Sequence, residues 1–135
     1  RNIIDKRKIS EEKYRCIENV ANQYLNILYN NAFALLYPSS YEGFGIPVLE
    51  AQKAGCPVIA YNGSSIPEII GDTPLLLNDL SVESILSKLD IIHDNRQREY
   101  IIKKGIENAS QYTWEKTFNN VLSLYKKAWE NSLLK

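Results

Sequence analysis

The sequence predicts an α/β fold, with a partial parallel sheet of three to four strands flanked by helices and a helical C-terminal region. Two observations predict it. Short apolar runs, typical of strands buried on both faces, alternate with segments whose apolar residues recur at helical spacing. The connections between these segments are short, and strands that alternate with helices in this way form parallel sheets.

Three apolar runs are candidate strands, and a fourth run is marginal. The first, residues 32–37, ends at Pro38. The second is residues 57–61, the third is the short run 74–77, and the marginal one is 15–18. A doubly wound sheet usually contains more strands than these. We therefore expect the remaining strands to precede the sequence printed here.

Five segments show the spacing of helices: 22–31, 47–54, 81–93, 96–111 and 113 onward. Asn22, Ser81 and Thr113 are candidate N-caps, because a short polar side chain can accept a hydrogen bond from the first free amides of a helix. Pro47 suits a first helical position, where a missing N–H costs nothing. The only histidine, His93, lies at a predicted helix end. Its predicted role is therefore structural.

The predicted last helix carries an apolar stripe: Trp114, Phe118, Val121, Leu122, Tyr125 and Trp129. We predict that this stripe lies mainly in the core, but that a domain of this size offers too little surface to cover its end at Trp129. We therefore expect the end of this helix to fray or to meet another molecule, with Trp129 not buried within the monomer.

Composition bounds the class of protein. The chain has 135 residues, 44% of them hydrophobic, with 16 basic and 16 acidic side chains. The length and the hydrophobic content predict one globular domain over residues 1–135. The equal numbers of basic and acidic side chains predict no attraction to nucleic acid. No apolar run approaches the ~18–20 residues of a membrane span, and no signal peptide is apparent. We expect a cytoplasmic protein with two free thiols, Cys16 and Cys56, and no metal site. Since the sequence lacks Met altogether, we expect a fragment of a longer protein.

The loop after the first predicted strand is the candidate site. It contains Glu42, Gly43 and Gly45 and leads into the helix that carries Glu50. Ligands of open α/β sheets bind where a loop feeds a helix N-terminus, and free amides there suit a phosphate. Carboxylates accept hydrogen bonds from sugar diols. Spacing alone leaves open a second interpretation, in which Glu42 is solvated and Glu50 caps nearby amides.

Three stretches carry a family resemblance: Y-E-G-F-G-I-P-V-L-E-A at 41–51, A-G-C-P-V-I-A-Y-N at 54–62 and S-S-I-P-E-I-I-G-D at 64–72. They resemble the C-terminal, nucleotide-sugar-binding domain of family 4 retaining glycosyltransferases of the GT-B fold. Glu42 and Glu50 match the E-x7-E element of that family. The similarity runs from about Val20 to Trp129, and it implies a Rossmann-like sheet.

The resemblance also implies roles for individual residues. Glu42 would contact the donor sugar near the reacting centre, as the catalytic residue, and Glu50 would hold the ribose hydroxyls. Backbone groups would line the sugar and the diphosphate at Gly43, Phe44, Gly45 and Ile46. Such enzymes transfer a sugar from a nucleotide-diphosphate sugar with retention of configuration, without a metal and without a cofactor beyond the donor. Ser64 and Ser65 are predicted as turn residues.

The resemblance further implies what lies elsewhere. The Arg and Lys that clamp the diphosphate, and the N-terminal domain that binds the acceptor, would precede this sequence, so we expect the isolated chain to be inactive. The whole protein would serve bacterial cell-surface polysaccharide synthesis, with peripheral association at the inner face of the membrane. One alternative is a non-enzymatic nucleotide-sugar-binding module of the same fold. A response-regulator-like domain would need an acidic cluster and a late Lys, which the sequence lacks.

Overall fold

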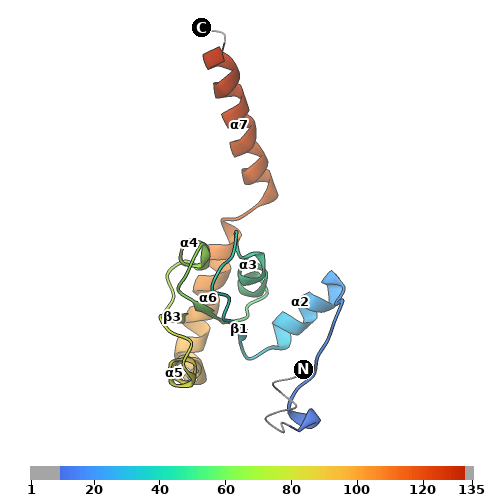
Figure 1. Cartoon of the computed structure of the whole chain (residues 1–135), viewed down its shortest axis with the longest axis vertical. Helices are drawn as coiled ribbons and strands as arrows, with labels where there is room; N and C mark the ends of the chain where they lie inside the picture. Colours follow the sequence, from blue (N-terminus) through green and yellow to red (C-terminus); the bar gives the residue numbers. More distant parts are fainter. Residues whose placement is uncertain (1–9, 133–135) are drawn as a thin grey trace.

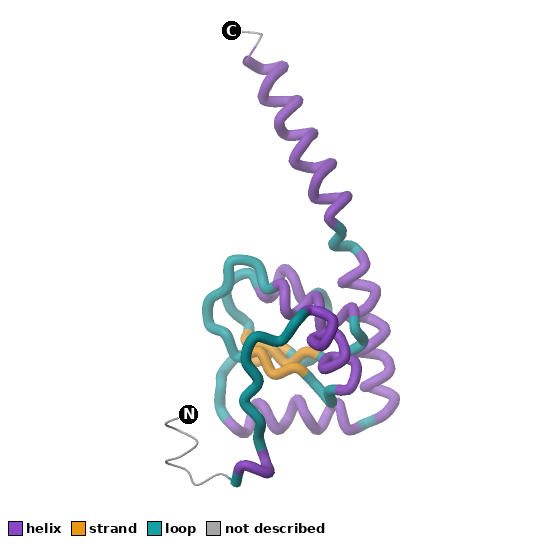
Figure 2. The backbone as a smooth tube through the Cα atoms, turned by 90° about the vertical axis from the view of Figure 1, so that its right-hand side faces the viewer, coloured by secondary structure: helices purple, strands orange, loops and turns teal. Residues whose placement is uncertain are grey.

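The computed structural model describes residues 10–132 and contains one parallel sheet with helices on both faces (Figures 1 and 2). Its strands lie in the order β1 (Leu35–Tyr37), β2 (Val58–Tyr61) and β3 (Leu76–Leu77). β1 pairs with β2 from Leu35 opposite Val58 to Tyr37 opposite Ala60. β2 pairs with β3 through Ala60 opposite Leu76. The predicted α/β class is confirmed.

Helices cover both faces of the sheet, because successive side chains of β2 point to opposite faces and are apolar on each. Val58 and Ala60 face a cluster shared with α2 (Asn22–Asn31), α3 (Ile46–Lys53) and α4 (Ile66–Ile70). Ile59 faces the opposite cluster, shared with α5 (Val82–His93) and α6 (Asn95–Ser110). Residues 58–60 are at most 3% exposed, as predicted for a strand buried on both faces.

Two strand predictions were wrong. Residues 15–18 form no strand; they follow a 3-10 turn, Glu11–Lys13, as irregular chain. An apolar run this short, interrupted by charges, needs a neighbouring strand in the described sheet, and it has none there. In β1, Leu36 is 45% exposed rather than buried. β1 is an edge strand, so the α5–α6 layer that covers Ile59 does not extend fully over it.

Local signals placed most helix ends correctly. The Ser81 hydroxyl accepts from the Ser84 amide at 3.1 Å at the start of α5. The Thr113 hydroxyl likewise accepts from the Lys116 amide at 3.1 Å at the start of α7 (Trp114–Ser132). Asn22 is not a cap, because α2 begins at Asn22 and Ala21 stands before it without a side-chain acceptor.

The C-terminal end of α3 is a Schellman motif. The Gly55 amide donates to the Gln52 carbonyl at 3.0 Å, and the Cys56 amide donates to the Ala51 carbonyl at 2.9 Å. Gly55 has φ +75°, a backbone conformation that glycine adopts without a steric penalty. The motif turns the chain directly into β2.

Helix α7 leaves the body of the molecule at the 111–113 linker and projects away from it (Figure 1). None of its residues is buried, so the prediction that its aromatic stripe lies mainly in the core is wrong: because the helix projects from the body, Trp114 is 85% and Phe118 65% exposed. Trp129 is 67% exposed, in agreement with the prediction that the monomer does not bury it. Helix α7 is regular as far as Ser132 in the described chain, so fraying does not begin at Trp129. Within residues 10–132, no helix is long and apolar enough to cross a bilayer.

Candidate functional site

The predicted loop lies where the sequence placed it, between the carboxyl end of β1 and the first turn of α3. Helix α3 begins at Ile46, so Pro47 is its second residue and leaves the helical hydrogen bonds intact. Gly45 precedes the helix with φ +100° and is buried against Ile66 of α4. The loop is therefore held tightly at its helical end.

Two serines from the start of α4 bind the carbonyls of this loop. The Ser64 hydroxyl donates to the Glu42 carbonyl at 2.8 Å. The Ser65 hydroxyl lies 3.0 Å from the Glu42 carbonyl and 3.0 Å from the Phe44 carbonyl. The sequence predicted only that these serines are turn residues. Their hydrogen bonds to the loop could not be predicted, because the two segments lie more than twenty positions apart in the sequence.

These hydrogen bonds orient the loop amides. In a trans peptide the carbonyl and the N–H point in opposite directions, and the described chain contains no cis peptide bond. The N–H groups of Gly43 and Gly45 therefore point away from the serines. Neither amide donates to an acceptor within residues 10–132. Unpaired amides beside a helix N-terminus form an environment that stabilises an anion.

The Glu42 carboxylate is bound by Tyr37, a residue that the site prediction missed. The Tyr37 hydroxyl donates to Glu42 Oε1 at 2.6 Å. This hydrogen bond, followed by one from Ser39, lowers the pKa of Glu42 below its ordinary value. Burial, together with the same bond to Glu42, raises the pKa of Tyr37 to about 12. Tyr37 therefore remains a protonated donor at neutral pH, and Glu42 remains ionised.

Glu50 occupies the exposed side of α3, while Val48 and Ala51 face the core. It borders two surface hollows. One, of about 450 Å³, is mostly apolar and has these lining residues: Phe44, Ile46, Leu49, Glu50, Lys53, Ala109, Tyr112, Thr113, Trp114 and Thr117. The other, of about 410 Å³, lies between α2 and α3 and includes Asn22, Asn26 and Tyr29. Both volumes lie within the range of small-molecule sites.

Tyr112 connects the loop with the α6–α7 linker. Its ring meets Phe44 edge-on, with centroids 6.1 Å apart. Its hydroxyl donates to the Glu68 carbonyl at 3.1 Å, and Glu68 lies in the first turn of α4. Phe44 and Ile46 remain about half exposed, at 46% and 53%. The loop thus leaves two apolar side chains exposed next to the hollow that they line.

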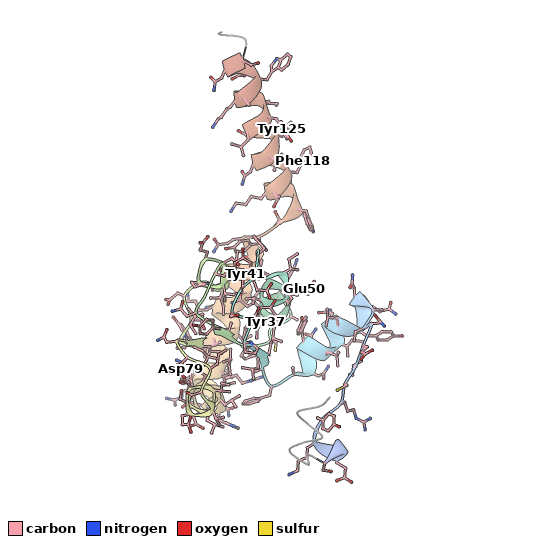
Figure 3. The ribbon with its side chains drawn as sticks, viewed as in Figure 1. Tyr37, Tyr41, Glu50, Asp79, Phe118 and Tyr125 are labelled. Carbon is pink, nitrogen blue, oxygen red and sulfur yellow. The ribbon has the colours of Figure 1, made fainter. Side chains whose placement is uncertain are left out.

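The structure describes all the predicted site residues and brings them to one region of the surface. Figure 3 shows Tyr37, Tyr41 and Glu50 in the region of β1 and α3, at a distance from the labelled Asp79. Residues 10–132 contain no group of three or more His, Cys, Asp or Glu side chains placed to share a metal ion.

Comparison with known proteins identifies the family. The family description "Glycosyl transferases group 1" matches residues 2–108, most of the chain. The chain belongs to the group 1 glycosyl transferases. It is 36% identical over 113 residues, 83% of its length, to the O-antigen chain mannosyltransferase B of Escherichia coli.

Two further relatives of this group 1 glycosyl transferase extend the similarity. The O-antigen chain mannosyltransferase RfbU of Salmonella typhimurium is 31% identical over 75% of the chain. The D-inositol 3-phosphate glycosyltransferase of Corynebacterium glutamicum is 29% identical over 90% of the chain. The chain spans 30% of the length of each of these three relatives.

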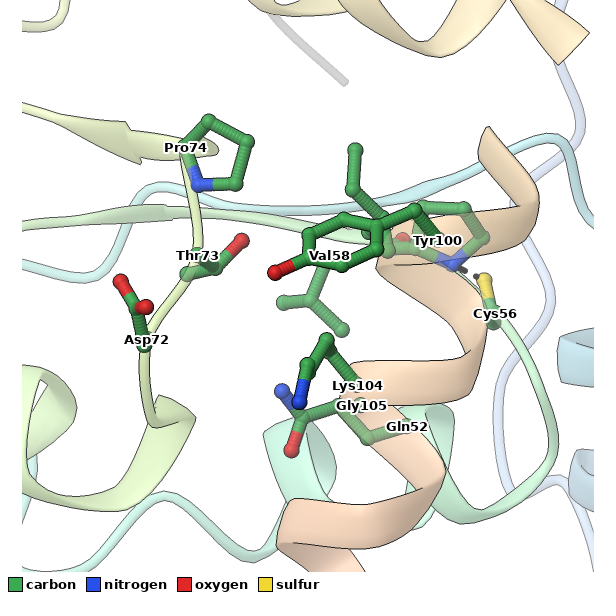
Figure 4. Close-up of a pocket in the computed structure, with 11 residues that line it drawn as sticks. Gln52, Cys56, Val58, Asp72, Thr73, Pro74, Tyr100, Lys104 and Gly105 are labelled. Carbon is green, nitrogen blue, oxygen red and sulfur yellow. Dashed lines mark hydrogen bonds between the residues drawn. The ribbon is translucent and has the colours of Figure 1, made fainter. Parts of the chain in front are cut away.

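A third space in this group 1 glycosyl transferase lies away from the loop, between Cys56, Asp72 and Tyr100 (Figure 4). Its volume is about 10 Å³, room for about one water molecule. The Cys56 thiol donates to the Pro57 carbonyl at 3.5 Å. This space is too small for a substrate, so the loop remains the candidate site.

The two thiols are expected to differ sharply in reactivity. Cys16 is exposed, whereas Cys56 is 2% exposed and its burial raises the pKa of its thiol. Because the thiolate is the reacting form, a disulfide-exchange reagent at pH 8 should label one thiol rapidly and the second only in denaturant. Cys16→Ser should remove the rapid phase. Rapid labelling of the Cys16→Ser variant in its native state would contradict the burial of Cys56.

Proposed function

We propose that this chain is the donor-binding part of a GT-B, family 4 glycosyltransferase that transfers a sugar from a nucleotide-diphosphate sugar with retention of configuration. The observation that carries the proposal is the orientation of the loop, whose Glu42 and Phe44 carbonyls are bound by Ser64 and Ser65. That orientation supports a diphosphate bound at the Gly43 and Gly45 amides. The N-terminal end of α3 would stabilise the charge that develops on the departing diphosphate.

The two carboxylates have separate roles in this proposal. Glu42 contacts the sugar near the reacting centre, and Glu50 accepts hydrogen bonds from the ribose hydroxyls. The position of Glu50 between two hollows supports a nucleoside seated beside α3. The hollow next to α2 offers the side-chain amides of Asn22 and Asn26, which can both donate to and accept from a nucleobase edge. No metal takes part in the proposed reaction.

The relatives suggest the donor sugar and the biological setting. Two of them are named as O-antigen chain mannosyltransferases. We therefore propose mannose as the transferred sugar and cell-surface polysaccharide as the product, and we choose GDP-mannose as the probe donor in the experiments below. We also propose a cytoplasmic site of action at the inner face of the membrane. An acceptor-binding domain outside this chain would complete the active site, so the isolated chain should bind the donor without transferring its sugar.

Calorimetric titration of the chain with GDP, UDP and ADP tests the donor site, using Glu50→Ala as the diagnostic variant. Loss of the hydrogen bonds from the ribose to a charged acceptor should weaken binding of the preferred nucleotide by roughly ten- to a hundredfold. Glu83→Ala, on the exposed first turn of α5, is the matched control and should bind normally. Equal affinity for Glu50→Ala and the unmodified chain would contradict the assigned role of Glu50.

The non-enzymatic alternative predicts a different result. A binding module would retain nucleotide affinity in this chain, yet the longer protein that contains it would transfer no sugar. Transfer from GDP-mannose by the longer protein, lost in Glu42→Gln, would support the enzyme.

A further inference from the structure

Tyr37 joins the sheet to the loop that carries the proposed catalytic carboxylate. It is the last residue of β1, and its backbone is held in register opposite Ala60 of β2. Its hydroxyl reaches Glu42 Oε1 at 2.6 Å. That distance lies within the range of about 2.5–2.7 Å for hydroxyl–carboxylate hydrogen bonds, which are among the stronger ones in proteins.

The surroundings of this hydrogen bond favour a neutral phenol and an ionised carboxylate. Tyr37 is half-buried and packs against the core cluster shared by α2, α3 and α4. Tyr29 of α2 also lies in this cluster. Burial, and then the nearby Glu50 carboxylate of α3, raise the pKa of the Tyr29 hydroxyl. No cation competes for Glu42 among the salt bridges of the described residues. The nearby Ser39 hydroxyl donates to the Tyr41 carbonyl at 3.2 Å. Within residues 10–132, the orientation of the Glu42 carboxylate is therefore set mainly by the Tyr37 hydroxyl, with a smaller contribution from Ser39, and its backbone is held by the serine bond.

We propose that Tyr37 is the positioning residue of Glu42, holding the carboxylate in one orientation so that its remaining acceptor positions meet the donor sugar. This inference rests on the proposed function of Glu42. A carboxylate offers about four acceptor positions, and the Tyr37 hydroxyl occupies one of them. A glutamate on a loop would otherwise lose rotational freedom when the donor binds, and that loss weakens binding.

Tyr37→Phe tests the inference, because it removes the hydroxyl and keeps the ring that packs in the core. Tyr61→Phe is the matched control: it removes a phenol hydroxyl at the end of β2, from a ring that packs against the opposite cluster, without breaking a hydrogen bond to Glu42. The first measurement is the pKa of Glu42 in the whole chain, followed by carboxyl NMR and assigned with Glu42→Gln. Tyr37→Phe should raise this pKa toward its ordinary value of 4.5, and Tyr61→Phe should not.

The second measurement compares the affinities for GDP-mannose and GDP by calorimetry. Tyr37→Phe should weaken binding of GDP-mannose roughly three- to tenfold and leave GDP unchanged, because Glu42 contacts only the sugar. A merely structural effect would weaken both ligands equally, which would overturn the inference. An unchanged pKa of Glu42 in Tyr37→Phe would overturn it as well.

Glu42→Gln separates this inference from the proposed function. If Glu42→Gln binds GDP-mannose as well as the unmodified chain does, the proposed role of Glu42 fails, and the inference fails with it. If Glu42→Gln binds GDP-mannose more weakly but Tyr37→Phe binds it normally, the role of Glu42 stands and only the positioning inference fails.

Discussion

Replacing Gly45 with alanine is expected to lower the free energy of unfolding by about 3 kcal/mol, through backbone strain and overpacking together. Gly45 has φ +100°, which an L side chain rarely adopts, and a Cβ atom there would lie 2.8 Å from Ile66 Cδ1. Ile66 is fully buried and cannot move aside without disturbing the core. Urea denaturation should report the loss as a lower midpoint with an unchanged slope.

Gly43→Ala is the matched control for this substitution. A Cβ atom at Gly43 would meet nothing within 4 Å, and Gly43 does not adopt a positive φ. Its stability should change by less than about 0.5 kcal/mol, as for other open surface positions. Since we propose that the Gly43 amide faces the donor diphosphate, the affinity of the Gly43→Ala variant for GDP also tests the proposed donor site. Equal stability losses in the two variants would contradict the described conformation of Gly45.

Asn108→Ala is expected to destabilise the chain by about 2–3 kcal/mol, because it leaves two partly buried acceptors without a donor. The Asn108 amide donates to Gln52 Oε1 at 2.8 Å and to the Ile69 carbonyl at 2.8 Å. Gln52 in turn donates to the Ile70 carbonyl at 2.8 Å and is only 6% exposed. This network joins α6 to α3 and α4, the two helices whose N-terminal ends hold the candidate site.

Asn30→Ala provides the comparison for Asn108→Ala. Its side chain also makes two hydrogen bonds, both to Asn26 within α2, but it lies on the exposed surface. Water can replace both partners there, so the expected loss is below about 0.5 kcal/mol. Thermal or urea denaturation of both variants measures the difference. A similar, small loss for both variants would show that the Gln52–Asn108 network contributes little to stability.

The sequence by itself determined the class of fold and the place of the candidate loop. The runs 57–61 and 74–77 contain β2 and β3, and the pattern 81–93 corresponds to α5 with its Ser81 cap. These features are set by neighbours within a few positions, so spacing and residue type suffice to predict them. The family of the chain was likewise readable from residues 41–72 and agrees with the family match.

Only the tertiary structure decided which groups hold the loop and how far each layer extends. The Ser64 hydroxyl reaches a carbonyl 22 positions away, and the Asn108 amide reaches a side chain 56 positions away. The exposure of Leu36, the missing strand at 15–18 and the projecting α7 also depend on which segments meet. Contacts of this kind depend on the packing of distant segments, which no local periodicity encodes. The Tyr37–Glu42 pair is only five positions apart, yet it forms because the loop folds back over the end of β1.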